Sequence, residues 1–168
     1  MAKGVPNRYP LPKDEDQYRT FLKLVEDGIE KERYIELVME ATGFKHKYIE
    51  VITDNLIFYG FVDRNKGSYS LKPHSKKYLN NPIEFSNLCR ASIDEIDSRH
   101  NSIIDFILDV SKKLSSRERD SVTVSQIYES MDANNDPFGG YEFAKKGRYT
   151  LREIIRLLLN SKYIKELD

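Results

Sequence analysis

The sequence of 168 residues contains no tryptophan, one cysteine and three histidines, and these scarcities exclude several kinds of site. A single cysteine, Cys89, excludes an intrachain disulfide and a cysteine-based zinc site. His46, His74 and His100 lie too far apart in the sequence to form a pair at a metal-ligand spacing. We therefore expect no metal ion and no other cofactor.

The sequence also lacks a long apolar run and an excess of charge of either sign. No apolar stretch approaches the roughly 18 residues of a membrane-spanning helix, and the first residues contain no apolar signal segment. We therefore expect a cytoplasmic protein with no membrane partner. Lys and Arg together number 27, as do Asp and Glu, so the formal net charge is zero. Because most nucleic-acid-binding domains are basic, this balance argues against such a partner unless charges gather locally.

Residues 45–71 are the most informative stretch that the sequence does contain. Apolar residues recur there at spacings of three and four, which predicts a helix with one buried face. These residues are Tyr48 or Ile49, Ile52, Leu56 and Tyr59. Gly60 is expected to end the helix in a left-handed conformation. Because the turn-forming run 65–67 separates an extended segment at Phe61 from the alternating run 68–71, the stretch predicts a helix followed directly by a β-hairpin.

Helices are predicted on both sides of this stretch. A helix over 14–25 starts with three acidic residues, which the helix dipole favours, and a helix over 31–42 is expected to end at Gly43. The residues expected on the buried face of the second helix are Tyr34, Ile35, Val38 and Met39. Downstream, Pro73 begins a short helix, and residues 83–99 contain a connector helix.

The second half of the sequence repeats part of this pattern. An amphipathic helix is expected over 103–114, and Thr150 is expected to cap a last helix that runs through Asn160 and leads to a strand at 163–165. At an offset of 102 residues, the matching pairs are Ile52 with Ile154, Leu56 with Leu158, Phe61 with Tyr163 and Val62 with Ile164. No second strand follows, so we expect either a degenerate unit or the front part of a longer protein.

The run FYGFVDRNKGSYSLKPHSKKYLNNP, residues 58–82, resembles the wing and trailing helix of bacterial winged-helix modules. Such modules occur in transcription regulators and, in tandem before a separate nuclease domain, in the DNA-recognition region of type II restriction endonucleases. The resemblance implies a mainly α fold with short β-hairpin wings, a tandem winged helix-turn-helix. Its implied parts are an extended N-terminal arm (1–13), winged-helix domain 1 (14–82), the connector helix (83–99) and a winged-helix-like domain 2 (100–168).

This resemblance places candidate DNA contacts on the predicted 45–59 helix and on the hairpin turn. In helix-turn-helix proteins, the N-terminal part of the second helix enters the major groove. Lysines there contact phosphate or guanine, and a glutamate accepts a hydrogen bond from cytosine. The candidates are Lys45, His46, Lys47, Glu50 and Thr53 on the helix, and Arg64, Asn65 and Lys66 on the hairpin. The alternative is an ordinary solvated helix face and turn, because the charges are mixed in sign.

A second group of candidate DNA contacts lies near the C-terminus. Its members are Lys145, Lys146, Arg148, Thr150, Arg152, Arg156 and Asn160. Arg152, Arg156 and Asn160 lie four residues apart, so we expect them to point outward together, opposite an Ile/Leu stripe. Arg and Asn pair bidentately with guanine and adenine, which makes this helix the stronger predicted reader of bases. The alternative is a surface helix whose arginines pair with Glu153.

No catalytic site is expected. A restriction-type nuclease needs a carboxylate and an acid-x-Lys pair on adjacent strands to hold Mg²⁺, whereas Glu142 and Lys145 have the wrong spacing and lie in a predicted loop. We therefore expect sequence-specific binding of double-stranded DNA, as the recognition module of a larger DNA-acting protein such as a restriction endonuclease. A downstream catalytic domain or another protein is the expected further partner. The alternatives are a free-standing winged-helix transcription regulator and a winged-helix scaffold that binds protein, and zero net charge favours the scaffold.

Overall fold

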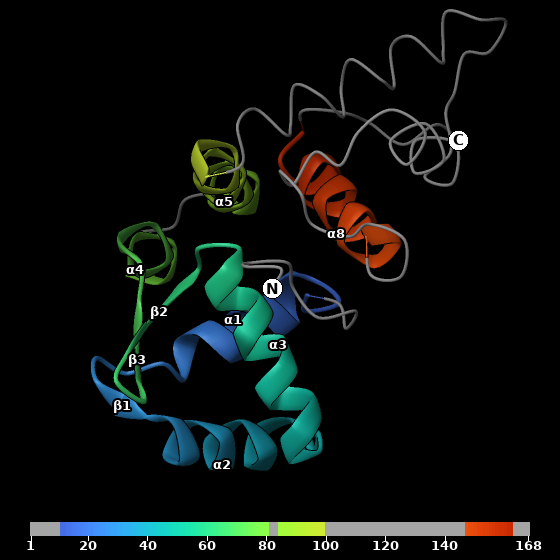
Figure 1. Cartoon of the computed structure of the whole chain (residues 1–168). Helices are drawn as coiled ribbons and strands as arrows, with labels where there is room; N and C mark the ends of the chain where they lie inside the picture. Colours follow the sequence, from blue (N-terminus) through green and yellow to red (C-terminus); the bar gives the residue numbers. More distant parts are fainter. Residues whose placement is uncertain (1–10, 81–83, 100–146, 163–168) are drawn as a thin grey trace, which may run out of the picture.

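The structure is a computed structural model, and it describes residues 11–80, 84–99 and 147–162 (Figure 1). This part of the chain is mainly helical and contains a three-stranded antiparallel sheet. Its elements are α1 (Glu15–Lys23), β1 (Ile29–Glu30), α2 (Lys31–Thr42), α3 (His46–Phe58), β2 (Val62–Asn65), β3 (Ser68–Leu71), α4 (Pro73–Asn80), α5 (Phe85–Arg99) and α8 (Gly147–Asn160). The predicted helix over 103–114, the predicted strand at 163–165 and the first ten residues of the predicted arm lie outside the described residues.

The first two long helices follow their sequence signals. Asp14 accepts a hydrogen bond from the backbone N–H of Gln17 at 2.9 Å and so caps α1. α2 has the predicted bounds, and Gly43 ends it with a left-handed φ of 75°. One predicted core residue is wrong, because Met39 is 39% exposed. It lies beyond the edge of the buried stripe of α2, whose last residue is Val38.

The sheet joins the predicted hairpin to a strand that the sequence did not predict. β1 pairs antiparallel with β3, and β3 pairs antiparallel with β2, so the strand order is β1-β3-β2. Ile29 lies opposite Tyr69, and Val62 lies opposite Leu71. β1 has two residues, too few to show a period-two pattern in the sequence. The connectivity is therefore helix, strand, helix, helix and hairpin, with the first strand along one edge of the hairpin.

α3 buries the face that its apolar spacing predicts. Of the residues predicted for this face, Ile49, Ile52, Leu56 and Tyr59 are fully buried and Tyr48 is half-buried. Gly60 ends the helix at a φ of 79°, as expected. The N–H of Phe61 donates to Leu56 O at 2.9 Å, and the N–H of Gly60 donates to Ile57 O at 3.1 Å. These bonds satisfy carbonyls that a helix end otherwise leaves without a partner, and they direct the chain into β2.

A two-residue turn, Lys66-Gly67, joins β2 to β3. Both residues have a positive φ, 50° and 84°, which is the geometry of a type I′ turn and matches the twist of paired strands. Glycine adopts this conformation freely, whereas the Cβ of Lys66 makes it unfavourable there. The turn places Lys66 at the exposed tip of the hairpin.

One hydrophobic core includes residues from every described helix and from the hairpin. α8 packs against α5 and adds Ile154, Leu157 and Leu158 to this core (Figure 1). The sequence predicted a separate C-terminal domain over 100–168. The described part of that segment shares the core of the N-terminal unit, and the predicted boundary at residue 100 lies outside the described residues.

α8 also holds the segment that precedes α1. Glu153 is 6% exposed and accepts a hydrogen bond from the backbone N–H of Leu11 at 3.1 Å. Arg156 Nη1 lies 2.9 Å from Glu153 Oε2. Arg156 Nη2 donates to the carbonyl oxygens of Pro12 at 3.3 Å and Lys13 at 2.8 Å. Two side chains on one turn of α8 therefore anchor residues 11–13.

We expect Gly60→Ala to destabilise the fold more than Gly43→Ala does. Both glycines have a left-handed φ, which makes an alanine unfavourable by about 1–2 kcal/mol. A Cβ at Gly43 meets nothing within 4 Å, whereas a Cβ at Gly60 overlaps the carboxylate of Glu95, which is paired with Lys72. In urea denaturation, the free energy of unfolding of Gly60→Ala should be ~1 kcal/mol lower than that of Gly43→Ala. Equal losses in the two variants would contradict the overlap.

Candidate nucleic-acid interface

The start of α3 presents positive charge to solvent. Lys45 is the N-cap residue and makes no side-chain capping hydrogen bond, and Lys45, His46 and Lys47 are all exposed. α3 has no acidic residue in its first turn, whereas α1 has Asp14 as its cap and two acidic residues in its first turn. Because the N-terminal end of a helix is itself partly positive, cations at this end are unfavourable. A contact from α2 offsets part of this charge, since Glu32 Oε2 lies 3.2 Å from His46 Nε2.

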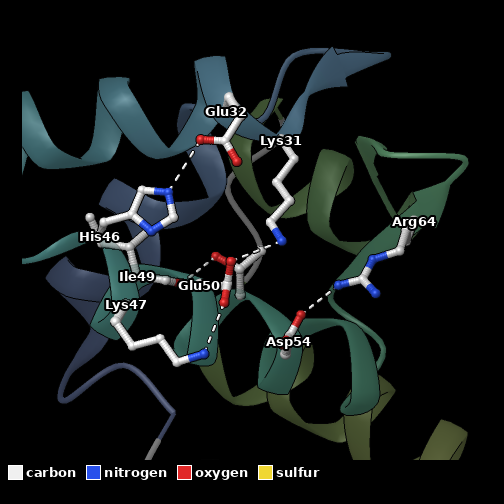
Figure 2. A network of polar contacts seen from close by, with 9 residues as sticks. Lys31, Glu32, His46, Lys47, Ile49, Glu50, Asp54 and Arg64 are labelled. Atoms are coloured by element: carbon white, nitrogen blue, oxygen red, sulfur yellow. Dashed lines mark hydrogen bonds and ion pairs between the residues drawn. The ribbon is translucent and has the colours of Figure 1, made fainter.

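Glu50, one turn further along α3, binds two lysines. Its Oε2 lies 2.9 Å from Lys31 Nζ at the start of α2, and its Oε1 lies 3.1 Å from Lys47 Nζ (Figure 2). Hydrogen bonds from Lys31 and then from Lys47 lower the pKa of the Glu50 carboxyl to about 2. Lys31 was not among the predicted site residues, because only the packing of α2 against α3 brings it to Glu50.

We expect Lys31→Met to raise the pKa of Glu50 more than Lys47→Met does. Lys31 is the closer partner, and its side chain is 35% exposed, against 76% for Lys47. The lowered pKa means that the pairing stabilises the fold above the unfolded value of about 4.3 and that this stability is lost as the pH falls toward 2. A carbon-13 NMR titration of the side-chain carboxyls measures the pKa in each variant. A larger rise in Lys47→Met would reverse the ranking of the two lysines.

An ion pair connects α3 to the hairpin. Arg64 Nη2 on β2 donates to Asp54 Oδ1 on α3 (Figure 2). The Arg64 guanidinium lies 5.9 Å from the centre of the Tyr69 ring. The backbone N–H of Lys31 donates to Gly67 O at 3.0 Å, which connects the hairpin turn to the start of α2. These contacts link α3, the start of α2 and the hairpin, and we call the polar residues at and beside them the α3–hairpin face. Its residues are Lys31, Lys45, His46, Lys47, Glu50, Asp54, Arg64, Asn65 and Lys66.

Lys45 and Lys66 differ from the other cations of the α3–hairpin face. Neither forms an ion pair with any other residue in the described ranges, whereas Lys31, Lys47 and Arg64 each do. Both residues are exposed: Lys45 lies at the start of α3, and Lys66 lies at the tip of the hairpin. Asn65 is exposed beside Lys66. The face therefore has two cations that can meet an external anion without losing an internal partner.

Thr53 is not on the exposed face of α3, where the sequence analysis placed it. Thr53 is fully buried, and its hydroxyl donates a hydrogen bond to Ile49 O at 2.7 Å. This hydrogen bond to a carbonyl of the same helix satisfies the hydroxyl, so the polar side chain of Thr53 can be buried. The structure thus excludes Thr53 from the surface while leaving the other predicted α3 candidates on it.

The C-terminal candidates lie apart from the α3–hairpin face. In Figure 1, α8 lies beside α5 and far from the hairpin turn and the start of α3. α8 begins at Gly147, so Thr150 lies inside the helix and is not its cap. The donors of Arg156 are bound to Glu153 and to backbone carbonyls, and Asn160 is half-buried. Lys145 and Lys146, and the side chains of Arg148, Thr150 and Arg152, lie outside the described residues.

The described part of the chain shows neither a metal-binding cluster nor a membrane-spanning helix. No group of three or more His, Cys, Asp or Glu side chains there is arranged to hold a metal ion. None of the helices in these ranges combines the length and apolarity needed to cross a bilayer. Comparisons of the chain with protein-family models, curated proteins and solved structures give no significant match. The connectivity and the α3–hairpin face are therefore the features of this chain that bear on its function.

Proposed function

We propose that the chain is a winged helix-turn-helix module that binds double-stranded DNA in a sequence-specific manner. α2, the short turn at residues 43–45 and α3 would form the helix-turn-helix, and β2 with β3 would form the wing. The connectivity supports this assignment, because β1 precedes the helix-turn-helix and pairs with the wing at its β3 edge. In this proposal α3 is the recognition helix and the α3–hairpin face is turned toward the duplex.

The uncapped, cationic start of α3 is the observation that carries the proposal. α1 begins with the acidic residues that stabilise a helix N-terminus, whereas α3 begins with Lys45, His46 and Lys47. Such a start is unfavourable in the free protein and becomes favourable when an anion approaches the free N–H groups and the lysines. A DNA phosphate at the edge of the major groove is an anion of this kind. Lys66 at the hairpin tip would contact a second phosphate from the same face.

Binding of a random pool of DNA duplexes, measured by electrophoretic mobility at two salt concentrations, tests the proposal. We expect a retained fraction at low salt that decreases at higher salt, because lysine–phosphate contacts release counterions. The recovered duplexes should share a sequence preference. We also expect the chain alone to leave these duplexes uncut in the presence of Mg²⁺, as a recognition module of a larger DNA-acting protein would. Absence of any retained duplex at low salt would refute the proposal.

A winged-helix scaffold that binds protein is the second candidate function. The observation that favours it is the internal pairing of the α3–hairpin face, where Lys31, Lys47 and Arg64 are already bound to carboxylates. A face with neutralised charges and a formal net charge of zero suits a mixed-charge protein surface better than a polyanion. The mobility assay separates the two candidates, since a protein scaffold would retain no duplex.

A further inference from the structure

We propose that Glu50 and Asp54 are specificity-determining residues that suppress binding to DNA phosphate alone. The inference rests on the proposed DNA-binding function and deepens it. The side chains of Glu50 and Asp54 are 21% and 49% exposed, and both residues are acidic where a nonspecific DNA-binding surface is basic. Both residues bind the cations beside them, and Glu50 also keeps acceptor positions that can face a base.

These two carboxylates bind most of the positive charge on the α3–hairpin face. Its five basic residues are Lys31, Lys45, Lys47, Arg64 and Lys66. Glu50 binds two of the three paired ones, at 2.9 and 3.1 Å, and Asp54 binds the third, Arg64. The pKa of Glu50, lowered to about 2, indicates that its lysines stabilise its charged form over the whole physiological pH range.

A phosphate that approaches the α3–hairpin face competes with these carboxylates for the paired cations. A lysine that leaves Glu50 for a phosphate exchanges one anionic partner for another, so its net gain is small. The carboxylate that it leaves then lies close to the phosphate, and like charges repel. Only Lys45 and Lys66 can bind phosphate without this exchange, as judged within the described residues. Contacts with the DNA backbone alone should therefore be few and weak.

A cytosine base in the major groove can bind Glu50 without displacing its lysines, and so avoids the repulsion between the carboxylate and a phosphate. A carboxylate has about four acceptor positions, and Glu50 uses two of them for Lys31 and Lys47. Its remaining positions can accept a hydrogen bond from the exocyclic amino group of cytosine in the major groove, the base that carboxylate side chains recognise. A duplex with cytosine opposite α3 therefore satisfies Glu50 while the lysines stay in place. A guanine or a thymine at that position leaves the carboxylate facing acceptor atoms.

The experiment compares the unaltered chain with Glu50→Gln and Asp54→Asn. Each is tested on a duplex recovered from the random pool and on the same duplex with its sequence scrambled, at two salt concentrations. Glu84→Gln is the control for the change in net charge, because Glu84 is an exposed acid next to a lysine, at 3.8 Å from Lys162, and lies on the α5–α8 side of the molecule. It changes the net charge by the same amount without altering the α3–hairpin face.

Freed cations should raise the affinity of Glu50→Gln and Asp54→Asn for the scrambled duplex roughly fivefold to tenfold per new phosphate contact. The salt slope should steepen by about one for each such contact. The preference for the recovered duplex should decrease by at least the same factor, and Glu84→Gln should keep it. If the unaltered chain prefers the recovered duplex and both variants keep that preference and slope, the inference alone fails. If no protein retains any duplex, the proposed function fails with it.

Discussion

Replacing Glu153 with alanine is expected to lower the free energy of unfolding by about 3 kcal/mol. Glu153 is 6% exposed, and its carboxylate accepts the backbone N–H of Leu11 and binds the Arg156 guanidinium. The substitution leaves that N–H and that cation without their acceptor in a largely buried setting. Loss of a buried partner costs about 3–5 kcal/mol, and the low end applies because Arg156 keeps the carbonyls of Pro12 and Lys13.

Urea denaturation followed by circular dichroism measures this loss, and Glu84→Ala provides the comparison. Glu84 is paired with Lys162 at 3.8 Å, but both side chains are more than 70% exposed. A surface pair of this kind contributes about 0–1 kcal/mol. The loss of unfolding free energy in Glu153→Gln should lie between those in Glu153→Ala and Glu84→Ala, because an amide oxygen still accepts a hydrogen bond from the Leu11 N–H. A loss in Glu153→Ala no larger than in Glu84→Ala would show that α8 does not anchor residues 11–13.

The double variant Lys45→Ala/Lys66→Ala is expected to lose affinity for every duplex on the order of 50-fold. This expectation follows from the proposed function. These lysines are the two members of the α3–hairpin face that form no ion pair within the described ranges, so each contributes its full charge to a phosphate contact. Because phosphate contacts carry no sequence information, recovered and scrambled duplexes should weaken alike, and the salt slope should decrease by about two.

Lys13→Ala/Lys162→Ala is the matched control for this double variant. Both lysines are exposed, and both lie close to α8, since the Lys13 carbonyl binds Arg156 and Lys162 follows the end of α8. The net charge changes by the same amount, but the α3–hairpin face is unaltered. Fluorescence anisotropy with labelled duplexes measures all dissociation constants. An equal loss in the control would mean that binding depends on overall charge and not on this face.

The parts of the fold that the sequence predicted well are those set by local signals. The bounds of α2, the end of α3 at Gly60 and the hairpin turn depend on apolar spacing and on residues that allow a left-handed backbone. Thr53 shows how such a signal can be overlooked. It lies four residues after Ile49 and three before Leu56, within the buried stripe, but its polar side chain suggested an exposed position. The hydroxyl is satisfied by a carbonyl of its own helix.

The features that the sequence could not predict depend on contacts between distant residues. Arg156 has the spacing of a base-reading residue, yet it binds the carbonyl of Pro12, which lies 144 residues earlier. Lys31 joins the α3–hairpin face only because α2 packs against α3. β1 is a strand because β3 offers it a pairing edge, as two residues have no recognisable pattern of their own. In each case the deciding partner is set by tertiary structure.

Photo-crosslinking from single introduced cysteines tests the central claim, that the α3–hairpin face is turned toward DNA. Cys89 is buried, and burial raises the pKa of its thiol to about 12, so a thiol-reactive photo-crosslinker should label only the introduced site. Lys45→Cys, Lys66→Cys and Lys162→Cys are labelled, bound to a duplex recovered from the random pool, and irradiated. We predict crosslinked DNA from positions 45 and 66 and none above background from position 162. Crosslinking from position 162 with none from the other two would contradict the account.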